Sequence, residues 1–131
     1  MSSYIIIIDE DEIVLKACPA EGPSLEDLQH IVKGHIQTVP VCSEIRKSAA
    51  GTAPLMIENE VGKLNGLPVN LIATAVCGHD IIVGPAAILN ATEENMQGFS
   101  REQHPLISYG MEKALKTLID GAKICGLAEE K

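Results

Sequence analysis

Aromatic side chains are almost missing from this sequence, which has 131 residues but only two tyrosines, one phenylalanine and no tryptophan. The core must therefore be aliphatic, and nucleic-acid binding on stacked aromatic rings is disfavoured. Basic residues are scarce too: 10 lysines and arginines stand against 18 aspartates and glutamates, for a net charge of −8. Because this field would repel a phosphate backbone, we expect no nucleic-acid partner.

Paired cysteines and membrane-spanning runs are also missing. The cysteines are far apart and form no Cys-x-x-Cys pair; they are Cys18, Cys42, Cys77 and Cys125. This spacing is typical of buried free thiols in a reducing compartment, so we expect a cytoplasmic protein. No segment approaches the length of apolar sequence that spans a bilayer, and no basic leader precedes the first apolar run. We therefore expect no membrane partner.

Signatures of catalysis and of metal binding are not found either. There is no Gly-x-Ser-x-Gly elbow, no phosphate loop and no dinucleotide fingerprint. The four histidines form no His-x-x-x-His pair and no cluster with cysteine, so we expect no metal site and no cofactor. His79 and Asp80 are an acid–base candidate, but neighbours along a chain rarely face each other, and a turn is the preferred interpretation. We predict no catalytic residue and a non-enzymatic protein.

Apolar runs of strand length predict a small mixed or antiparallel sheet. The expected strands are residues 4–8, 13–17, 35–41, 54–58, 81–83 and 86–90. The first two would form a hairpin around an acidic turn that runs from Asp9 to Glu12. Isoleucine fills four consecutive positions of the first strand, which predicts burial on both of its faces. Pro40 places the third strand at an edge of the sheet.

Helical periodicity adds a short N-terminal helix at 24–33, with Ser24 as its cap and Gly34 as a left-handed stop. Asn70 would cap a second short helix, 71–76. Residues 43–52 are expected to form a surface loop or a short helical turn, and residues 92–98 a polar connection.

A long amphipathic helix, 105–125, is predicted within a C-terminal segment at 100–126. Ser100 could cap its start, Pro105 fits its first turn, and Gly126 is its expected stop. Its apolar face would pack on the sheet or join copies of the chain. The whole pattern predicts an α+β fold in one domain, residues 1–131.

One stretch combines rigid turn chemistry with many hydrogen-bonding side chains. It is an apolar strand that runs into a loop whose backbone is fixed by Gly66 and Pro68. Its polar residues are the predicted ligand-binding set: Asn59, Glu60, Lys63, Asn65 and Asn70. Asparagine both donates and accepts hydrogen bonds, and a lysine suits a phosphate or a carboxylate. The structural alternative is that the asparagines support their own turn or cap a helix, with Glu60 and Lys63 as a surface pair.

The sequence Ile57-Glu-Asn-Glu-Val-Gly-Lys-Leu-Asn-Gly-Leu-Pro-Val-Asn70 resembles the core signature of a family of short proteins from phages, mobile elements and gut Firmicutes, the domain of unknown function number 3846. The preceding helix and strand, 24–40, and the following Asp80-Ile-Ile-Val-Gly84 are similar as well, so the resemblance covers about residues 4–91. Two features depart from it: Leu71 stands where the family usually has an arginine, and the C-terminal helix differs.

The resemblance implies an accessory or counter-defence role for a phage protein in the cytoplasm of a host bacterium. The leading hypothesis is a non-enzymatic, homo-oligomeric sponge that sequesters a nucleotide-derived immune signal of the cyclic ADP-ribose type. One alternative is an inhibitor that binds a host defence protein through the acidic surface or the C-terminal helix. Another is a small nucleotide hydrolase that uses His79, Asp80 or Glu60.

Overall fold

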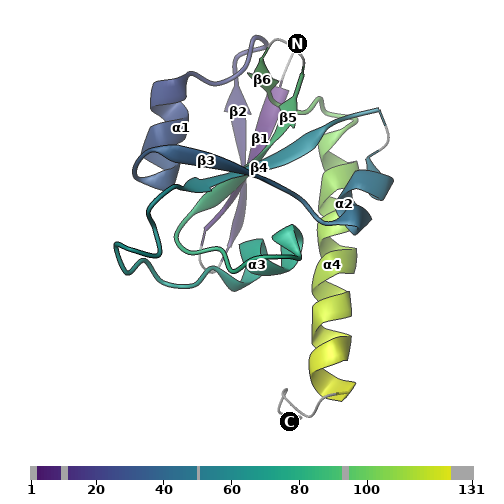
Figure 1. Ribbon diagram of the computed structural model, residues 1–131. Coiled ribbons are helices and arrows are strands. Elements are labelled where there is room, and N and C mark those ends of the chain that lie inside the picture. The colour runs from purple at the N-terminus through teal and green to yellow at the C-terminus, as the bar shows by residue number, and fades with distance from the viewer. Residues whose placement is uncertain (1–2, 10–11, 50, 93–94, 125–131) are drawn as a thin grey trace.

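The computed structural model describes residues 3–9, 12–49, 51–92 and 95–124, with side chains of the last helix described to residue 116. Within these residues six antiparallel strands form one sheet, in the order β2-β1-β5-β4-β3 with β6 paired to β5 (Figure 1). The strands are β1 Ser3–Ile8, β2 Ile13–Cys18, β3 Ile36–Pro40, β4 Pro54–Asn59, β5 Ala86–Ala91 and β6 Met96–Gln97. The helices are α1 Leu25–Val32, α2 Ser43–Ser48, α3 Leu71–Cys77 and α4 His104–Ile124. The predicted α+β class is confirmed.

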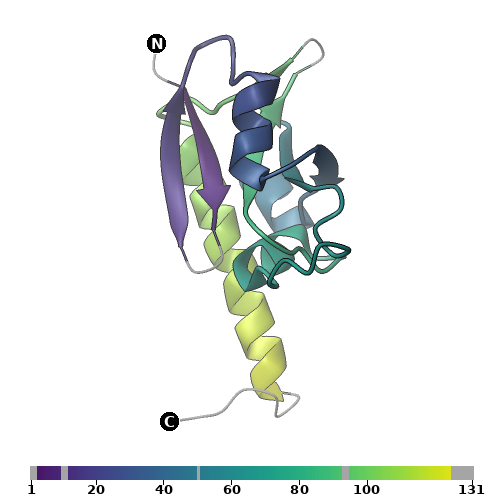
Figure 2. The same cartoon turned by 90° about the vertical axis from the view of Figure 1, so that its left-hand side faces the viewer.

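Helices cover both faces of the sheet (Figures 1 and 2). One apolar cluster joins Ile6 and Ile8 of β1 to residues of α2, α3 and α4. A second joins Ile5 of β1 to Leu28 and Val32 of α1. The isoleucine run of β1 is thus buried on both faces, as its lack of alternation predicts. The hairpin of β1 and β2 is confirmed; Glu10 and Asp11 at its tip lie outside the described residues.

Helix α1 begins as predicted, because the Ser24 hydroxyl accepts a hydrogen bond from Asp27 N at 3.1 Å. Its predicted end is wrong: the left-handed residue is Lys33, with φ 64°, and not Gly34. Gly34 has another reason to lack a side chain. A Cβ there would lie 2.7 Å from Nδ2 of Asn59, so the glycine makes room for that side chain.

Segment 43–52 contains the short helix α2, so the helical alternative is confirmed and the surface loop is wrong. Ile45 of α2 is fully buried in the cluster shared with α3 and α4. A Cβ on Gly110 of α4 would lie 2.8 Å from the Ile45 Cα, so the two helices approach closely at a glycine. The single buried isoleucine among polar neighbours is too weak a pattern to predict this packing.

The strand predicted at 81–83 is wrong, because its backbone bonds to a loop rather than to the sheet. Ile82 O accepts from Asn70 N, Gly84 N donates to Pro68 O, and Val83 forms only an isolated bridge with Val69. Segment 92–98, expected as a polar connection, contributes the two-residue strand β6. By contrast β3, which ends at Pro40, lies at an edge of the sheet as predicted.

Helix α4 begins one residue before the predicted start and extends beyond the sheet (Figure 1). Ser100 and Gln103 bond each other's backbone N–H groups at 2.9 and 3.1 Å, and Pro105 lies in the first turn. The predicted stop, Gly126, lies outside the described residues. None of the helices in the described part of the chain is long and apolar enough to span a bilayer.

Candidate functional site

Asn70 stands between the loop of the signature and α3, and its side chain is fully buried. Its Nδ2 donates to Ile8 O and to Gly84 O, both at 2.9 Å. Its Oδ1 accepts from Ala73 N at 3.0 Å and so caps α3 as predicted. Both the Nδ2 donor and the Oδ1 acceptor of the amide are therefore engaged, and together they hold three segments of backbone.

Asn59, at the end of β4, is also buried and also engaged with backbone. Its Nδ2 donates to Val32 O at 3.0 Å and to Lys33 O at 3.2 Å, while its Oδ1 accepts from Val61 N at 2.9 Å. The side chain thus satisfies carbonyls at the end of α1 that have no partner within the helix. These contacts match the structural alternative for both asparagines.

The other three predicted residues, Glu60, Lys63 and Asn65, are exposed. Lys63 Nζ lies 2.9 Å from Asp80 Oδ1, with the two side chains about half exposed. Glu60, Lys63 and Asn59 line one small pocket, but Asn65 and Asn70 do not line it. The structure thus brings together three members of the predicted set and separates the other two.

Glu58 is the residue of this pocket that sequence reasoning missed. The pocket has a volume of about 170 Å³ and is lined by Gln37, Glu58, Asn59, Glu60, Val61, Lys63, Leu64 and Asp80. Only 6% of Glu58 is exposed, and it pairs with Gln37 across β3 and β4. Strand alternation offers the missed signal, because Glu58 lies on the same face as the buried Met56, where an apolar residue is expected.

Burial is the main cause that raises the pKa of Glu58, and the Asp80 carboxylate adds to it, while Lys63 and His79 oppose it. The Lys63 hydrogen bond is the main cause that lowers the pKa of Asp80, and the bond from Ile81 N adds to it. The same bond to Asp80 raises the pKa of Lys63. The charge of Lys63 is therefore directed mainly at Asp80, and the pKa of Glu58 stays above its ordinary value.

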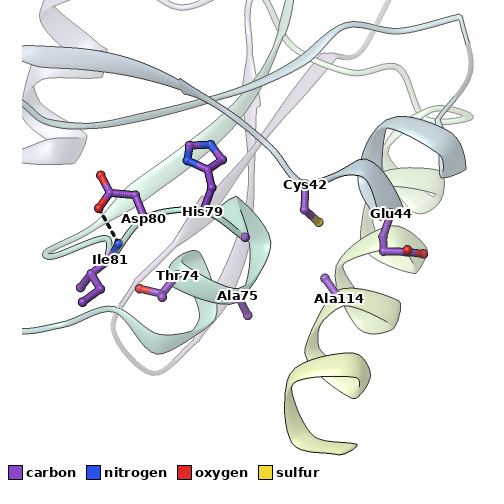
Figure 3. A pocket seen from close by; sticks show the side chains of 9 residues that line it. Cys42, Glu44, Thr74, Ala75, His79, Asp80, Ile81 and Ala114 are labelled. Atoms are coloured by element: carbon purple, nitrogen blue, oxygen red, sulfur yellow. Dashed lines mark hydrogen bonds between the residues drawn. The ribbon is translucent and has the colours of Figure 1, made fainter. Parts of the chain in front are cut away.

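A larger groove also has Asp80 among its lining residues (Figure 3). It has a volume of about 580 Å³ and lies between the start of α2, the end of α3 with its following turn, and α4. Its lining residues are Cys42, Glu44, Thr74, Ala75, Gly78, His79, Asp80, Ile81 and Ala114. Most of this wall is apolar, and Asp80, which accepts from Ile81 N at 2.8 Å, belongs to both hollows.

A third hollow of about 270 Å³ shares Cys42, Gly78 and His79 with the groove. Arg46 of α2 lines this end. The groove therefore shares lining residues with both smaller hollows, one of which contains Glu58 and Asp80 and the other Arg46.

The residues of the acid–base candidate have separate partners. His79 Nε2 lies 3.2 Å from Pro40 O and 3.4 Å from Cys77 Sγ, whereas Asp80 Oδ1 accepts from Lys63 and Ile81. Burial raises the pKa of the Cys77 thiol, which makes it a poor nucleophile. No group of three or more potential ligands among the described residues could hold a metal ion.

These features define a small α+β domain: a helix-covered antiparallel sheet with a pocketed surface where β4, α2 and α3 meet. The family model described as "Domain of unknown function (DUF3846)" matches residues 1–118. The chain therefore belongs to that family, and the match extends past the 4–91 expected from the motif into α4. No curated protein and no solved structure matches the chain.

Proposed function

We propose that this protein binds a small polar ligand in the three connected hollows and holds it without turning it over. The observation that supports this proposal best is the position of Asp80, which lines both the acidic pocket and the apolar groove. Ligand sites commonly combine an apolar wall with a few convergent polar groups. The groove supplies the wall, and the two flanking hollows supply polar groups of different charge.

A nucleotide-derived molecule suits this arrangement. A ring system would lie against Ala75, Ile81 and Ala114 in the groove. A phosphate would be best placed toward Arg46, because the opposite end carries Glu58 and Asp80. The proposal that the ligand is an immune signal of the cyclic ADP-ribose type, sequestered by a phage protein in a bacterial cytoplasm, depends on the family setting.

Retention rather than turnover is favoured by how the candidate catalytic groups are used. The Cys77 thiol beside His79 is buried, and burial raises its pKa. Asp80 is held by a lysine and a backbone N–H, so its carboxylate is a weak general base.

The direct test is to incubate the protein with cyclic ADP-ribose isomers, remove free ligand, denature by heat and identify what is released by mass spectrometry. Unchanged ligand in the released fraction is the expected result. A modified product would identify a hydrolase instead, and the absence of any retained nucleotide would contradict the proposal.

A blocked groove provides the matched variant for this test. Ala75→Phe places an aromatic ring where Ala75 lines the groove, and we expect ligand retention to be lost. Ala20→Phe, on an exposed turn far from the hollows in sequence, is the control and should retain ligand as the wild type does. Equal ligand retention by both variants would show that the ligand does not bind in the groove.

A second candidate function, inhibition of a host defence protein, is favoured by exposed apolar side chains around the signature loop. Leu64 and Leu71 are 87% and 68% exposed, and Val61, Val69 and Ile81 are exposed as well. Surface patches of this kind often mark protein contacts. A complex with a host protein that persists in Ala75→Phe but is lost in Leu64→Ser would support this candidate.

We also propose that copies of the chain associate through β2. This strand is an edge of the sheet, and its Ile13, Val14 and Leu15 are each at least 40% exposed. Exposed apolar edge strands pair readily with further strands. Light scattering should give a dimer or larger species for the wild type and a smaller species for Val14→Lys; a monomeric wild type would contradict the proposal.

A further inference from the structure

We infer that the pocket at Glu58 recognises a positively charged, hydrogen-bond-donating group of the ligand, such as a protonated amine or an amidine, and not a phosphate. This inference deepens the proposed function by naming the chemistry that the acidic end accepts. It can also be tested with simple ions, so it can fail or succeed separately from the retention of a nucleotide.

The first observation is the unmatched hydrogen-bonding capacity of Glu58. In the described part of the chain no donor bonds to its carboxylate, although the residue is 94% buried because only 6% of it is exposed. Its oxygens are not sealed in dry protein, since no fully buried side-chain oxygen of the described residues lacks a partner. The carboxylate therefore opens into the pocket that Glu58 lines. A buried acceptor in this position is expected to have a donor supplied from elsewhere.

The second observation is that the neighbouring cation does not supply this donor. Lys63 Nζ bonds Asp80 Oδ1 at 2.9 Å, and its side chain is about half exposed. The charged groups that line the pocket are the carboxylates of Glu58, Glu60 and Asp80 and the one ammonium. His79 also acts on Glu58 from the adjoining turn. Three acidic groups against one lysine favour a cation and repel an anion.

The volume of the pocket and the pairing of Gln37 with Glu58 further limit which ligand group can bind there. A volume of about 170 Å³ holds roughly five or six water-sized groups at ~30 Å³ each, enough for a guanidinium or a short amine. Gln37 stands directly opposite Glu58 in the ladder, and its amide oxygen can accept a second N–H from the same group. The site therefore offers two acceptors from adjacent strands to one planar or branched donor.

The test uses methylguanidinium chloride and inorganic phosphate as separate probes, each titrated at low ionic strength into the ¹⁵N-labelled full chain. We expect methylguanidinium to shift the amides of Gln37, Glu58 and Lys63, and phosphate to leave them unchanged. In Glu58→Gln, which keeps the shape but loses the charge, the affinity for methylguanidinium should fall about tenfold, the effect of losing one charge-assisted hydrogen bond.

Glu102→Gln is the control, because Glu102 is an exposed carboxylate that lines none of the three hollows. It should weaken methylguanidinium binding no more than about twofold, as expected for an exposed charge. A further readout is the Glu58 carboxyl titration followed by ¹³C NMR: a bound cation should move the pKa of Glu58 down toward its ordinary value, which a purely structural carboxylate would not show.

Three results would overturn the inference: phosphate shifting the pocket amides, Glu58→Gln binding methylguanidinium as the wild type does, or Glu102→Gln losing as much affinity as Glu58→Gln. If methylguanidinium binding depends on Glu58 but no nucleotide is retained, the proposed function fails and the inference stands. If a nucleotide is retained with its affinity unchanged in Glu58→Gln, the proposed function stands and the inference fails.

Discussion

Asn70 and Glu58 are both polar and both buried, at 0% and 6% exposure, yet their surroundings are opposite. Asn70 makes three hydrogen bonds to backbone atoms of β1, α3 and the turn before β5. The carboxylate of Glu58 accepts none from the described residues and opens into a pocket. A saturated buried group is committed to the architecture, whereas an unsaturated one keeps its bonding capacity for something outside the fold.

The same contrast divides the signature loop. Its asparagines at 59 and 70 turn inward, while Lys63, Leu64 and Asn65 face solvent. The motif therefore serves first to hold a loop in place, and its outward residues are the ones free to meet a ligand or partner. Substitutions on the two sides of this division should differ in kind: inward ones alter the free energy of unfolding, and outward ones alter binding.

The largest expected effect is that of Asn70→Ala. Truncation leaves Ile8 O, Gly84 O and Ala73 N without their partners in the buried interior. We expect the free energy of unfolding to fall by about 3–5 kcal/mol, measured by urea denaturation. Asn65→Ala, on the exposed side of the loop, should change it by less than about 0.5 kcal/mol. A comparable fall in the free energy of unfolding in both variants would contradict the division between inward and outward residues.

Next in size is Gly34→Ala, because the new Cβ would lie 2.7 Å from Asn59 Nδ2. We expect a loss of about 2 kcal/mol in the free energy of unfolding. The same substitution in an Asn59→Ala background should cost about 1 kcal/mol less, since the clashing amide is gone. Additive losses in this double-mutant cycle would show that Gly34 is needed for some other contact.

Glu58→Met should act in the opposite direction and stabilise the protein by about 1 kcal/mol at neutral pH, because it replaces an unpaired carboxylate by an apolar side chain. The expected gain is small because the carboxylate oxygens reach the pocket. The reference is Glu60→Met, which is exposed and should give no gain in thermal or urea unfolding. A destabilised Glu58→Met protein would mean that the carboxylate has a structural partner.

The pH dependence of Glu58→Gln sharpens this test. A pKa raised in the folded state means that the native protein binds the proton more tightly than the unfolded chain. The contribution of Glu58 to stability is then present below the ordinary glutamate pKa of about 4.3 and is lost as the pH rises through the raised value. Relative to wild type, Glu58→Gln should gain stability over this window; a constant difference across pH would contradict the raised pKa.

The smallest expected effect on stability is that of Lys63→Ala. Both members of the Lys63–Asp80 pair are exposed, so the unfolding midpoint should not change measurably. The pKa of Glu58 should nevertheless rise further, because Lys63 is one of the groups that lowers it. Carboxyl titration by NMR can detect this rise, and an unchanged titration would show that Lys63 acts on Asp80 alone.

Patterns along the chain predict most of the fold, because apolar periodicity reports burial directly. The β1–β2 hairpin, the caps at Ser24 and Asn70 and the start of α4 all follow from such local patterns. The errors occur where tertiary contacts decide. Segment 81–83 is apolar like a strand, but its hydrogen bonds go to residues 68–70, a pairing that no local pattern encodes.

The candidate site is harder to predict for the same reason. Asn59 and Asn70 stand out in the sequence because turn chemistry is local, and the structure assigns them contacts with backbone. Glu58 stands out only when strand alternation is followed two residues past Met56 and the opposite strand is known. The groove combines residues of α2, α3 and α4, and such combinations arise only on folding.

The hydrogen bond between Asn70 and Ile8 joins positions 62 apart in sequence, which has a kinetic meaning. Such a contact closes a long stretch of chain, and the conformational entropy lost on closure opposes its early formation. Contacts that are absent from the folding transition state mainly slow unfolding. We therefore expect Asn70 to act as a latch, whose truncation speeds unfolding more than it slows folding.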